Sequence, residues 1–267
     1  MNNELVDITI LVVSCDKYSD TWNSFFHLFF KNWPDCPYPI KLVSNYLEYS
    51  DNRVGSIKVG KDLDYSSNLI KALSNVETDW VIFWVEDRPP SRQVDTTSLI
   101  EIIDLAISKN AAYLKLIPCY PPALVDKENK IGVITKGSRY LVSMTVALWR
   151  TEVLLELLKP GETAWDIEKH GGIARAKQSN YDFYALSIDS YSNPPIQDIH
   201  LISKGKLMAR GIHLLRREGL LDSLSSRKTS SIKHNLYFEL YDVFWNLIYQ
   251  TIWIKMKLIK IIKSNNR

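Results

Sequence analysis

The sequence predicts an α/β fold, with a mixed central sheet flanked by helices and an amphipathic helical tail at the C-terminal end. Two runs, 8–13 and 80–85, are continuously apolar and rich in β-branched or aromatic residues, as strands buried on both faces are. Between such runs, apolar residues recur every three to four positions, which is typical of amphipathic helices. Glycine and proline make up only 10 and 11 of the 267 residues, which excludes a low-complexity linker protein.

The first part of the chain alternates strands and helices. We expect strands at 8–13, 40–43, 56–59, 80–85 and 111–117, and helices at 19–33, 66–76 and 95–109. Aromatic residues at helical spacing mark the first of these helices, which Ser19 or Asp20 is expected to cap and Pro34 to end. Consecutive units of this kind build one sheet, with a ligand crevice at the carboxyl ends of its strands.

The order of elements changes in the second part of the chain. The segments 131–135 and 141–148 predict a hairpin with Gly137 in its turn. Helices are expected at 150–158 and 164–178, and a late strand at 183–188.

Several protein classes are disfavoured by what the sequence lacks. Three cysteines, Cys15, Cys36 and Cys119, are too few for a disulfide framework and lack the spacing of a zinc site, which predicts a reducing compartment. The chain begins with no basic-then-apolar leader, and no uncharged apolar run reaches about 18 residues, so neither secretion nor a spanning helix is expected. The first strand is followed by Ser-Cys-Asp-Lys and not by a GxGxxG turn, which argues against a dinucleotide oxidoreductase.

The net charge of +3 is unevenly distributed. Residues 227–267 hold eight of the 33 lysines and arginines but only two of the 30 acidic residues, so they carry +6 and the rest of the chain carries −3. We therefore divide the chain into an acidic body, 1–226, and a basic, aromatic tail, 227–267. An anionic surface is the expected partner of the tail alone, and the acidic body argues against a nucleic acid as partner.

The main candidate for chemistry is the pair Glu86 and Asp87, directly after the strand at 80–85. Adjacent carboxylates at a strand end repel each other unless a cation or a proton relieves them. A divalent ion, Mn²⁺ or Mg²⁺, that bridges the pair to phosphate oxygens is a simple solution. An ordinary acidic turn is the alternative.

Two further clusters of charged residues stand out. Asp166 and Glu168 lie near the start of a predicted helix, where they point to different sides. At most one of them therefore faces the site, where it could act as a general base. The alternative is that both are acids at a helix N-terminus, where the helix dipole favours negative charge. Lys204 and Lys206 flank a glycine, as expected of a mobile loop that closes over a diphosphate, or else of a solvated loop. His170 is either a site residue or a residue at a helix end.

Four blocks of the chain, at 12–18, 84–87, 147–168 and 204–206, together resemble bacterial glycosyltransferases of the GT-A type that act in surface-polysaccharide synthesis, such as that of O-antigen lipopolysaccharide or capsule. The resemblance spans most of the body and implies a GT-A-like, Rossmann-like domain over 1–226. It also implies that the chain moves a sugar from a nucleotide-sugar donor to a lipid-linked or saccharide acceptor, with inversion. A non-catalytic nucleotide- or sugar-binding module tethered by its tail is the alternative.

The resemblance also implies roles for individual residues. Ser14 and Asp16 correspond to the region that holds the nucleotide, and Lys204 and Lys206 to a phosphate-facing loop. Glu86 and Asp87 correspond to the acidic motif that holds the metal and the diphosphate. Glu168, in preference to Asp166, corresponds to the catalytic carboxylate. Arg88 departs from the family pattern, in which another acid or an apolar residue follows the acidic pair, and its guanidinium could neutralise the diphosphate in place of a metal.

The tail has the composition of a helix that lies on a membrane. Its aromatic residues recur every four positions and are followed by lysines: Tyr237, Tyr241, Trp245, Tyr249, Trp253, Lys255, Lys257, Lys260 and Lys263. Aromatic rings suit the headgroup boundary and lysines suit anionic lipid. We expect a cytoplasmic protein that is peripheral at the inner face of the cell membrane; a helix packed on the body or in a homodimer interface is the alternative.

Overall fold

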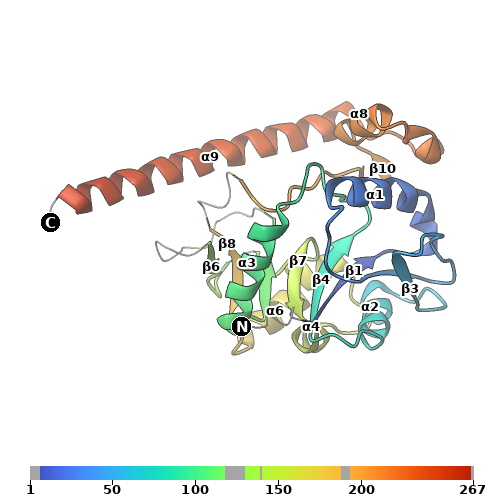
Figure 1. The fold of residues 1–267 in the computed structure, drawn as a ribbon, viewed down its shortest axis with the longest axis horizontal. Coiled ribbons are helices and arrows are strands. Elements are labelled where there is room, and N and C mark those ends of the chain that lie inside the picture. Colours follow the sequence, from blue (N-terminus) through green and yellow to red (C-terminus); the bar gives the residue numbers. More distant parts are fainter. Residues whose placement is uncertain (1–6, 118–129, 139, 188–192, 266–267) are drawn as a thin grey trace.

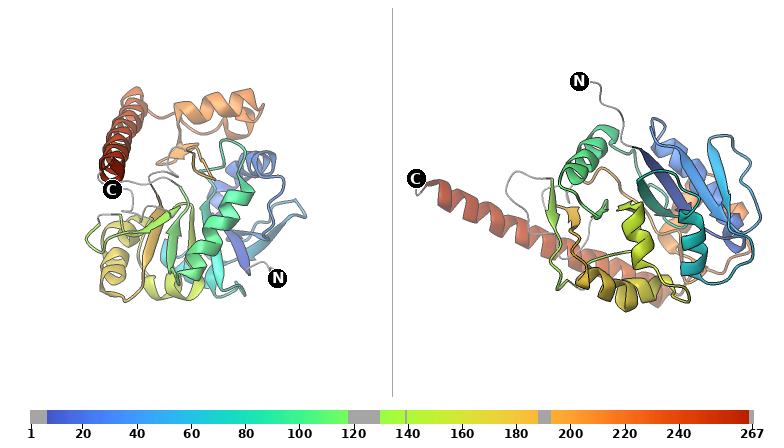
Figure 2. Two further views of the ribbon diagram at one scale, coloured as in Figure 1. Left: turned by 60° about the vertical axis from the view of Figure 1, so that its left-hand side comes forward. Right: turned by 90° about the horizontal axis from the view of Figure 1, so that it is seen from below.

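The computed structural model describes residues 7–117, 130–138, 140–187 and 193–265, and within them an eight-stranded sheet carries helices on both faces (Figures 1 and 2). The strands of this sheet are β1 (Ile8–Val13), β2 (Ile40–Ser44), β3 (Val54–Lys58), β4 (Trp80–Val85), β5 (Tyr113–Lys115), β6 (Ile131–Val133), β7 (Ala147–Arg150) and β8 (Phe183–Leu186). A small separate hairpin is formed by β9 (Ile202–Ser203) and β10 (Lys206–Leu207).

The helices of the body are interspersed with the strands along the chain. They are α1 (Ser19–Asn32), α2 (Tyr65–Leu73), α3 (Thr96–Ser108), α4 (Thr151–Leu157), α5 (Ala164–Lys169), α6 (Gly171–Gln178) and α8 (Ala209–Arg217), with the short 3₁₀ turns η1 (Asp16–Tyr18) and η2 (Leu221–Leu224). The chain then ends in one long helix, α9 (Ile232–Asn265).

The strand order is β3-β2-β1-β4-β7-β5-β8-β6. The first four strands in this order are parallel, β7 runs antiparallel to both β4 and β5, and β8 is parallel to β5. As a result, the carboxyl ends of β1, β2, β4, β5 and β8 and the first residue of β7 meet at one edge of the sheet. The α/β class and the mixed sheet predicted from the sequence are confirmed.

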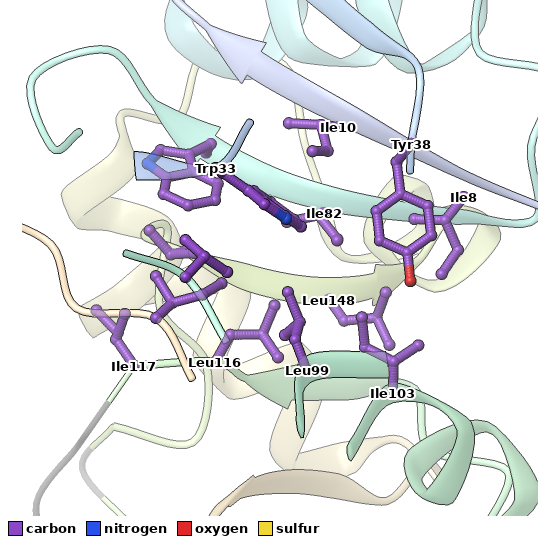
Figure 3. Packing of buried hydrophobic residues seen from close by; sticks show 14 of the residues in the cluster. Ile8, Ile10, Trp33, Tyr38, Ile82, Leu99, Ile103, Leu116, Ile117 and Leu148 are labelled. Atoms are coloured by element: carbon purple, nitrogen blue, oxygen red, sulfur yellow. The ribbon is translucent and has the colours of Figure 1, made fainter. Parts of the chain in front are cut away.

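The central strands bury both of their faces, as their unbroken apolar runs predict. In β1, Ile10 and Val12 pack on one side with α1 and α3, whereas Leu11 and Val13 pack on the other side with α2 and α4. Figure 3 shows the first of these clusters, in which Ile82 and Leu148 from the sheet face Trp33 and Leu99 from the helix side. The two clusters make the sheet rigid at the point where the acidic pair leaves it.

The predicted hairpin of 131–135 and 141–148 is wrong. β6 pairs with β8, while β7 lies between β4 and β5 in the middle of the sheet. The difference in burial explains this arrangement, because Leu148 and Trp149 are fully buried in the centre while Val133 is 43% exposed at the edge. A local pattern shows that a segment is extended and apolar, but its pairing partner is decided by burial in the whole sheet.

The single helix predicted at 164–178 is also wrong, since the chain breaks at His170 into α5 and α6. The two helices meet so closely that a Cβ at position 172 would lie 2.7 Å from the backbone of Ile167, which explains the glycine at that position. His170 is the residue between the two helices and is exposed.

The predicted cap of α1 is not observed. The N-cap position is Tyr18, which makes no side-chain capping bond, and η1 leads directly into the helix. The side chain of Asp20 instead binds Arg227.

The helix α9 confirms the expected helical tail. Figure 1 shows it passing over the body and extending beyond it. Its first turns are attached to the body through Arg210, which binds Glu239 and Asp242, and through the ring of Phe238, whose centroid lies 5.8 Å from that of His200. Among the described residues, no helix is both long and apolar enough to cross a bilayer.

Residues 227–230, which the sequence analysis assigns to the tail, also contact the body. Leu207 of β10 accepts a hydrogen bond from the backbone of Ser230 and donates one to Lys228. The tail therefore begins as an addition to the β9–β10 hairpin.

A candidate active site at the carboxyl ends of the strands

The pair Glu86 and Asp87 is held in a defined turn at the end of β4. The backbone N–H of Arg88 donates to the carbonyl of Val85 at 3.1 Å, and the indole of Trp84 donates to the carbonyl of Arg88 at 2.7 Å. On the other side, the N–H of Leu201 donates to the carbonyl of Asp87 at 2.8 Å. These bonds join the turn both to the core and to the segment 197–201.

Both carboxyl groups of this pair bind protons more readily than ordinary carboxyl groups do. Burial and the neighbouring charge of Asp87 raise the pKa of Glu86, whose side chain lies inside the protein with only 8% of the residue exposed. Burial likewise raises the pKa of Asp87 to about 6, against an opposing effect of Arg88. Glu86 is therefore shielded from bulk water, Asp87 is partly exposed, and a cation would stabilise the charged forms of both.

Two arginines lie near the pair, and both already have an acidic partner. Arg88 binds Asp198, and Arg227 binds Asp20 through two nitrogen–oxygen contacts of 2.6 Å while its guanidinium lies 4.4 Å from the centre of the Tyr18 ring. The charge of Arg227 lowers the pKa of both Glu86 and Asp87, as the charge of Arg88 does for Asp87. The sequence analysis missed Arg227 as a site residue, because no local signal connects it to a turn about 140 positions earlier.

His200 is a second residue that the sequence analysis missed. Burial and the charge of Arg88 lower its pKa to about 3, so its imidazole is neutral at pH 7 and has a nitrogen lone pair available. His200 follows Asp198, whose backbone pairs with that of Pro90 just after the acidic turn. The next residue, Leu201, donates its N–H to the carbonyl of Asp87.

The residues described do not form a complete metal site by themselves. No group of three His, Cys, Asp or Glu side chains that could hold an ion occurs among them. Mg²⁺ and Mn²⁺, however, are often held by one or two carboxylates together with phosphate oxygens of the substrate. The buried pair Glu86 and Asp87 fits an ion that is bound in this way.

Ser14 and Asp16 lie at the end of β1, beside β4, but their side chains already have partners. The hydroxyl of Ser14 accepts a bond of 2.8 Å from the indole of Trp22. The carboxylate of Asp16 accepts bonds from the backbone N–H groups of Asn45, Tyr46 and Leu47. Asp16 therefore holds the loop after β2 against β1, and any contact with a nucleotide would have to share these bonds.

The structure separates the two acids of α5. Asp166 accepts bonds from the N–H and hydroxyl of Thr163 at 2.9 and 2.6 Å and so closes the cap of the helix. Glu168 points elsewhere, and one of its oxygens accepts bonds from the hydroxyl of Ser143 at 3.0 Å and from the N–H of Met144 at 2.6 Å. These two donors precede β7 at the same edge of the sheet as the acidic pair.

Lys204 and Gly205 form a tight turn, and Lys206 begins β10. Both turn residues have positive φ angles, 51° and 73°, which is the conformation of a two-residue hairpin turn. A Cβ on Gly205 would lie 4.0 Å from the hydroxyl of Tyr18, so the turn is close to the ring on which Arg227 lies. Both lysine side chains are exposed.

The charges of both the acidic pair and Glu168 act on one buried hydroxyl. The hydroxyl of Tyr65, at the first position of α2, is buried, and the charges of Glu168, Glu86 and Asp87 all raise its pKa in addition to burial. Carboxylates contributed by β4 and by α5 are therefore brought near one hydroxyl. Nothing in the sequence around Tyr65 indicates this, since the residues beside it have the pattern of an ordinary helix N-terminus.

A groove of about 480 Å³ lies apart from these side chains, along α8. Its lining residues are Ser91, Ile199, Ala209, Arg210, His213, Leu214 and Arg217. It is wide and open, and none of the carboxylates discussed above lines it.

The comparisons with known proteins concern the fold. The sequence matches no protein-family model and no curated protein at a significant level. The chain has a mixed, Rossmann-like α/β fold. Its structure is similar to that of TarS 1–349 from S. aureus in complex with UDP-GlcNAc, at 14% identity and a TM-score of 0.47, over 86% of this chain and 69% of that one.

Two other solved structures show a comparable likeness. One is a longer TarS structure, at 15% identity and a TM-score of 0.44 over 68% of this chain; this chain spans only 35% of its length. The other is a cytidylyltransferase from Leptospira borgpetersenii, at 10% identity and a TM-score of 0.44, over 85% of this chain and 100% of that one. At these values the likeness supports no conclusion about activity.

Proposed function

We propose that this chain is a GT-A-like glycosyltransferase that moves a sugar from a nucleotide-sugar donor to a glycan or lipid-linked acceptor, with inversion. The observation that supports it most is that carboxylates from two separate parts of the chain act electrostatically on one buried hydroxyl, that of Tyr65. The charges of Glu86 and Asp87, after β4, and of Glu168, on α5, all act on this hydroxyl. A displacement at an anomeric carbon needs a carboxylate base for the acceptor and a charged clamp for the leaving group.

The proposed step is a single displacement at the anomeric carbon of the donor sugar. The acceptor oxygen attacks the anomeric carbon while its proton passes to the carboxylate of Glu168. The bond between that carbon and the phosphate oxygen breaks, and its electron pair leaves with the nucleoside diphosphate. Attack opposite the leaving group inverts the configuration at that carbon.

The leaving diphosphate gains negative charge in this step. A divalent ion held by Glu86 and Asp87 would supply positive charge there. Arg88, Arg227, Lys204 and Lys206 contribute positive charge from this chain, and the two arginines would have to share their present acidic partners with the phosphates. Ser14 and Asp16 are proposed to face the nucleotide at the end of β1.

The first test is a panel of UDP-, GDP-, ADP- and CMP-sugars screened by thermal unfolding, with and without Mn²⁺ or Mg²⁺. One nucleotide class is expected to raise the melting temperature by several degrees, because a ligand at a hundredfold excess over its Kd stabilises the native state by about 2.7 kcal/mol. If no nucleotide sugar stabilises the protein, the proposal fails. Stabilisation without any hydrolysis or transfer to an acceptor would favour the binding-module alternative instead.

We further propose that α9 places the protein on an anionic membrane surface, where a lipid-linked acceptor of surface-polysaccharide synthesis would lie. One face of α9 is attached to the body, while large apolar side chains on the remaining surface are exposed: Leu236, Tyr237, Leu240, Tyr241, Val243, Phe244, Leu247, Ile254 and Leu258. Exposed Lys255 lies between the last two of them, Ile254 and Leu258. The other residues predicted to contact the membrane have side chains outside the described part of the structure: Trp245, Tyr249, Trp253, Lys257, Lys260 and Lys263.

Replacing both Leu240 and Leu247 by Gln is expected to lower binding to vesicles of phosphatidylglycerol and phosphatidylcholine about tenfold or more, because each leucine contributes more than 1 kcal/mol when it leaves water. Co-sedimentation of the full chain measures this. Leu63→Gln is the matched control, since Leu63 is 68% exposed on the body, and it should bind vesicles like the wild type. Unchanged vesicle binding of the double variant, or a change only in oligomeric state, would overturn the membrane role.

A further inference from the structure

The first turn of α2 is fixed to the segment before α5. The carboxylate of Asp64 caps α2 by accepting bonds from the N–H and hydroxyl of Ser67 at 2.9 and 2.6 Å. The same carboxylate accepts a bond of 3.0 Å from the N–H of Gly161, and the N–H of Ser66 donates to the carbonyl of Glu162 at 3.1 Å. Tyr65 lies between Asp64 and Ser66, which make these bonds, and therefore has little freedom to move.

The ring of Tyr65 packs against the core cluster below α2 and α4, yet its hydroxyl is not used by the fold. Among the described residues, this buried oxygen has no hydrogen-bond partner. A buried hydroxyl without a partner loses its bonds to water and destabilises the folded state. Such a group in a rigid position requires an explanation beyond packing.

The surroundings of the hydroxyl show which group could use it. The bonds to Gly161 and Glu162 hold this turn against the segment before α5, which carries Glu168, and the charges of Glu168, Glu86 and Asp87 all act on the hydroxyl. Burial and these charges raise its pKa, so it stays protonated at neutral pH and is able to donate. In the proposed function, the part of the substrate between the acceptor and the diphosphate is the transferred sugar.

We propose that the Tyr65 hydroxyl binds an oxygen of the sugar of the nucleotide-sugar donor and so positions the anomeric carbon between Glu168 and the acidic pair. This inference rests on the proposed function and assigns a further residue to its donor site. The ligand oxygen is the partner that the fold itself does not supply.

The test is Tyr65→Phe, which removes one oxygen and keeps the ring. The probes are UDP-N-acetylglucosamine with UDP, or the best donor of the panel with its free nucleotide. The melting temperature should stay the same or rise, because an unpaired buried hydroxyl is lost. Affinity for the free nucleotide should stay within about twofold, affinity for the nucleotide sugar should fall about five- to tenfold, and kcat/KM should fall about tenfold or more.

Ser66→Ala is the matched control. Its hydroxyl is also buried without a partner among the described residues, one position further along α2. It should leave both affinities and kcat/KM unchanged, which separates use of the Tyr65 oxygen from a general effect of altering this turn.

The outcomes distinguish the two proposals. If the wild type binds no nucleotide sugar, the proposed function has failed. If the wild type transfers sugar and Tyr65→Phe does so equally well, only the role of Tyr65 is overturned. A fall in melting temperature, or an equal loss of affinity for nucleotide and nucleotide sugar, also overturns it, because the hydroxyl would then serve the fold or the diphosphate.

Discussion

Asp87→Asn is expected to abolish sugar transfer, lowering kcat/KM by about a thousandfold or more, and to raise the melting temperature at neutral pH. The asparagine keeps the shape of the side chain but removes the negative charge that would hold a cation at the leaving diphosphate. The gain in stability follows from the same site, because burial and the charge of Asp198 disfavour the charged form of Asp87.

The stability difference between this variant and the wild type should depend on pH. The pKa of Asp87 is about 6 in the folded protein, above the value of 3.8 for a free side chain. The folded state therefore binds more protons than the unfolded state between these values, and the wild type loses stability as pH rises through this window. The asparagine does not titrate, so its advantage should be small near pH 4 and should grow to at most about 3 kcal/mol at pH 7.

Asp51→Asn provides a control with the opposite sign. Asp51 pairs with Arg53 at 2.6 Å, which lowers the pKa of its carboxyl to about 2. Its stabilising effect is present above the unfolded pKa and is lost as pH falls toward 2, so the variant should be less stable than the wild type at pH 7. Transfer should be unchanged. Thermal unfolding across pH and initial rates measure both variants; an active Asp87→Asn enzyme would remove the clamp from the proposal.

Glu168→Gln is expected to lower turnover by about a hundredfold to ten-thousandfold, because the amide cannot take the proton of the acceptor hydroxyl. Glutamine keeps an oxygen that can accept the bonds from Ser143 and from the N–H of Met144, so the segment before β7 should stay in place. The Kd of the nucleotide sugar should change little, since the base acts on the acceptor. Single-turnover rates and donor binding measure the two effects separately.

Asp166→Asn is the comparison for this variant. Its carboxylate closes the capping box of α5 with Thr163, so the variant should unfold at a lower temperature and still transfer sugar at a near-normal rate. A slow Asp166→Asn enzyme beside an unimpaired Glu168→Gln enzyme would show that the base is assigned to the wrong acid.

Much of the central sheet is predictable from local patterns. The strands at 8–13 and 80–85 agree with β1 and β4 to the residue, because an unbroken apolar run bounded by polar residues allows little else. The helices after them are found because their apolar faces repeat every three to four residues. The partners of β7 were not predictable, because it lies between β4 and β5, which are both distant from it in the sequence, and its own apolar residues do not specify a partner.

The candidate site divides in the same way. Glu86 and Asp87 are visible in the sequence because they directly follow the most apolar strand. The choice between Asp166 and Glu168 depends on which one Thr163 engages and which one reaches Ser143, and those contacts come from the packing of α5. The expected nucleotide contacts of Ser14 and Asp16 stay predictions, since both side chains also serve the fold.

By itself, the amino-acid sequence determined the class of the fold, the strand that ends in the acidic pair, and the uneven charge of body and tail. These properties depend on residues that are neighbours along the chain, whose periodicity reports which faces must leave water. Only the tertiary structure decided that the charge of Arg227 acts on that pair, that the pair acts on the Tyr65 hydroxyl, and that His200 is buried where Arg88 affects it. These residues come from α2, the start of the tail and the segment after β8, so their places depend on long-range packing that no local sequence pattern reports.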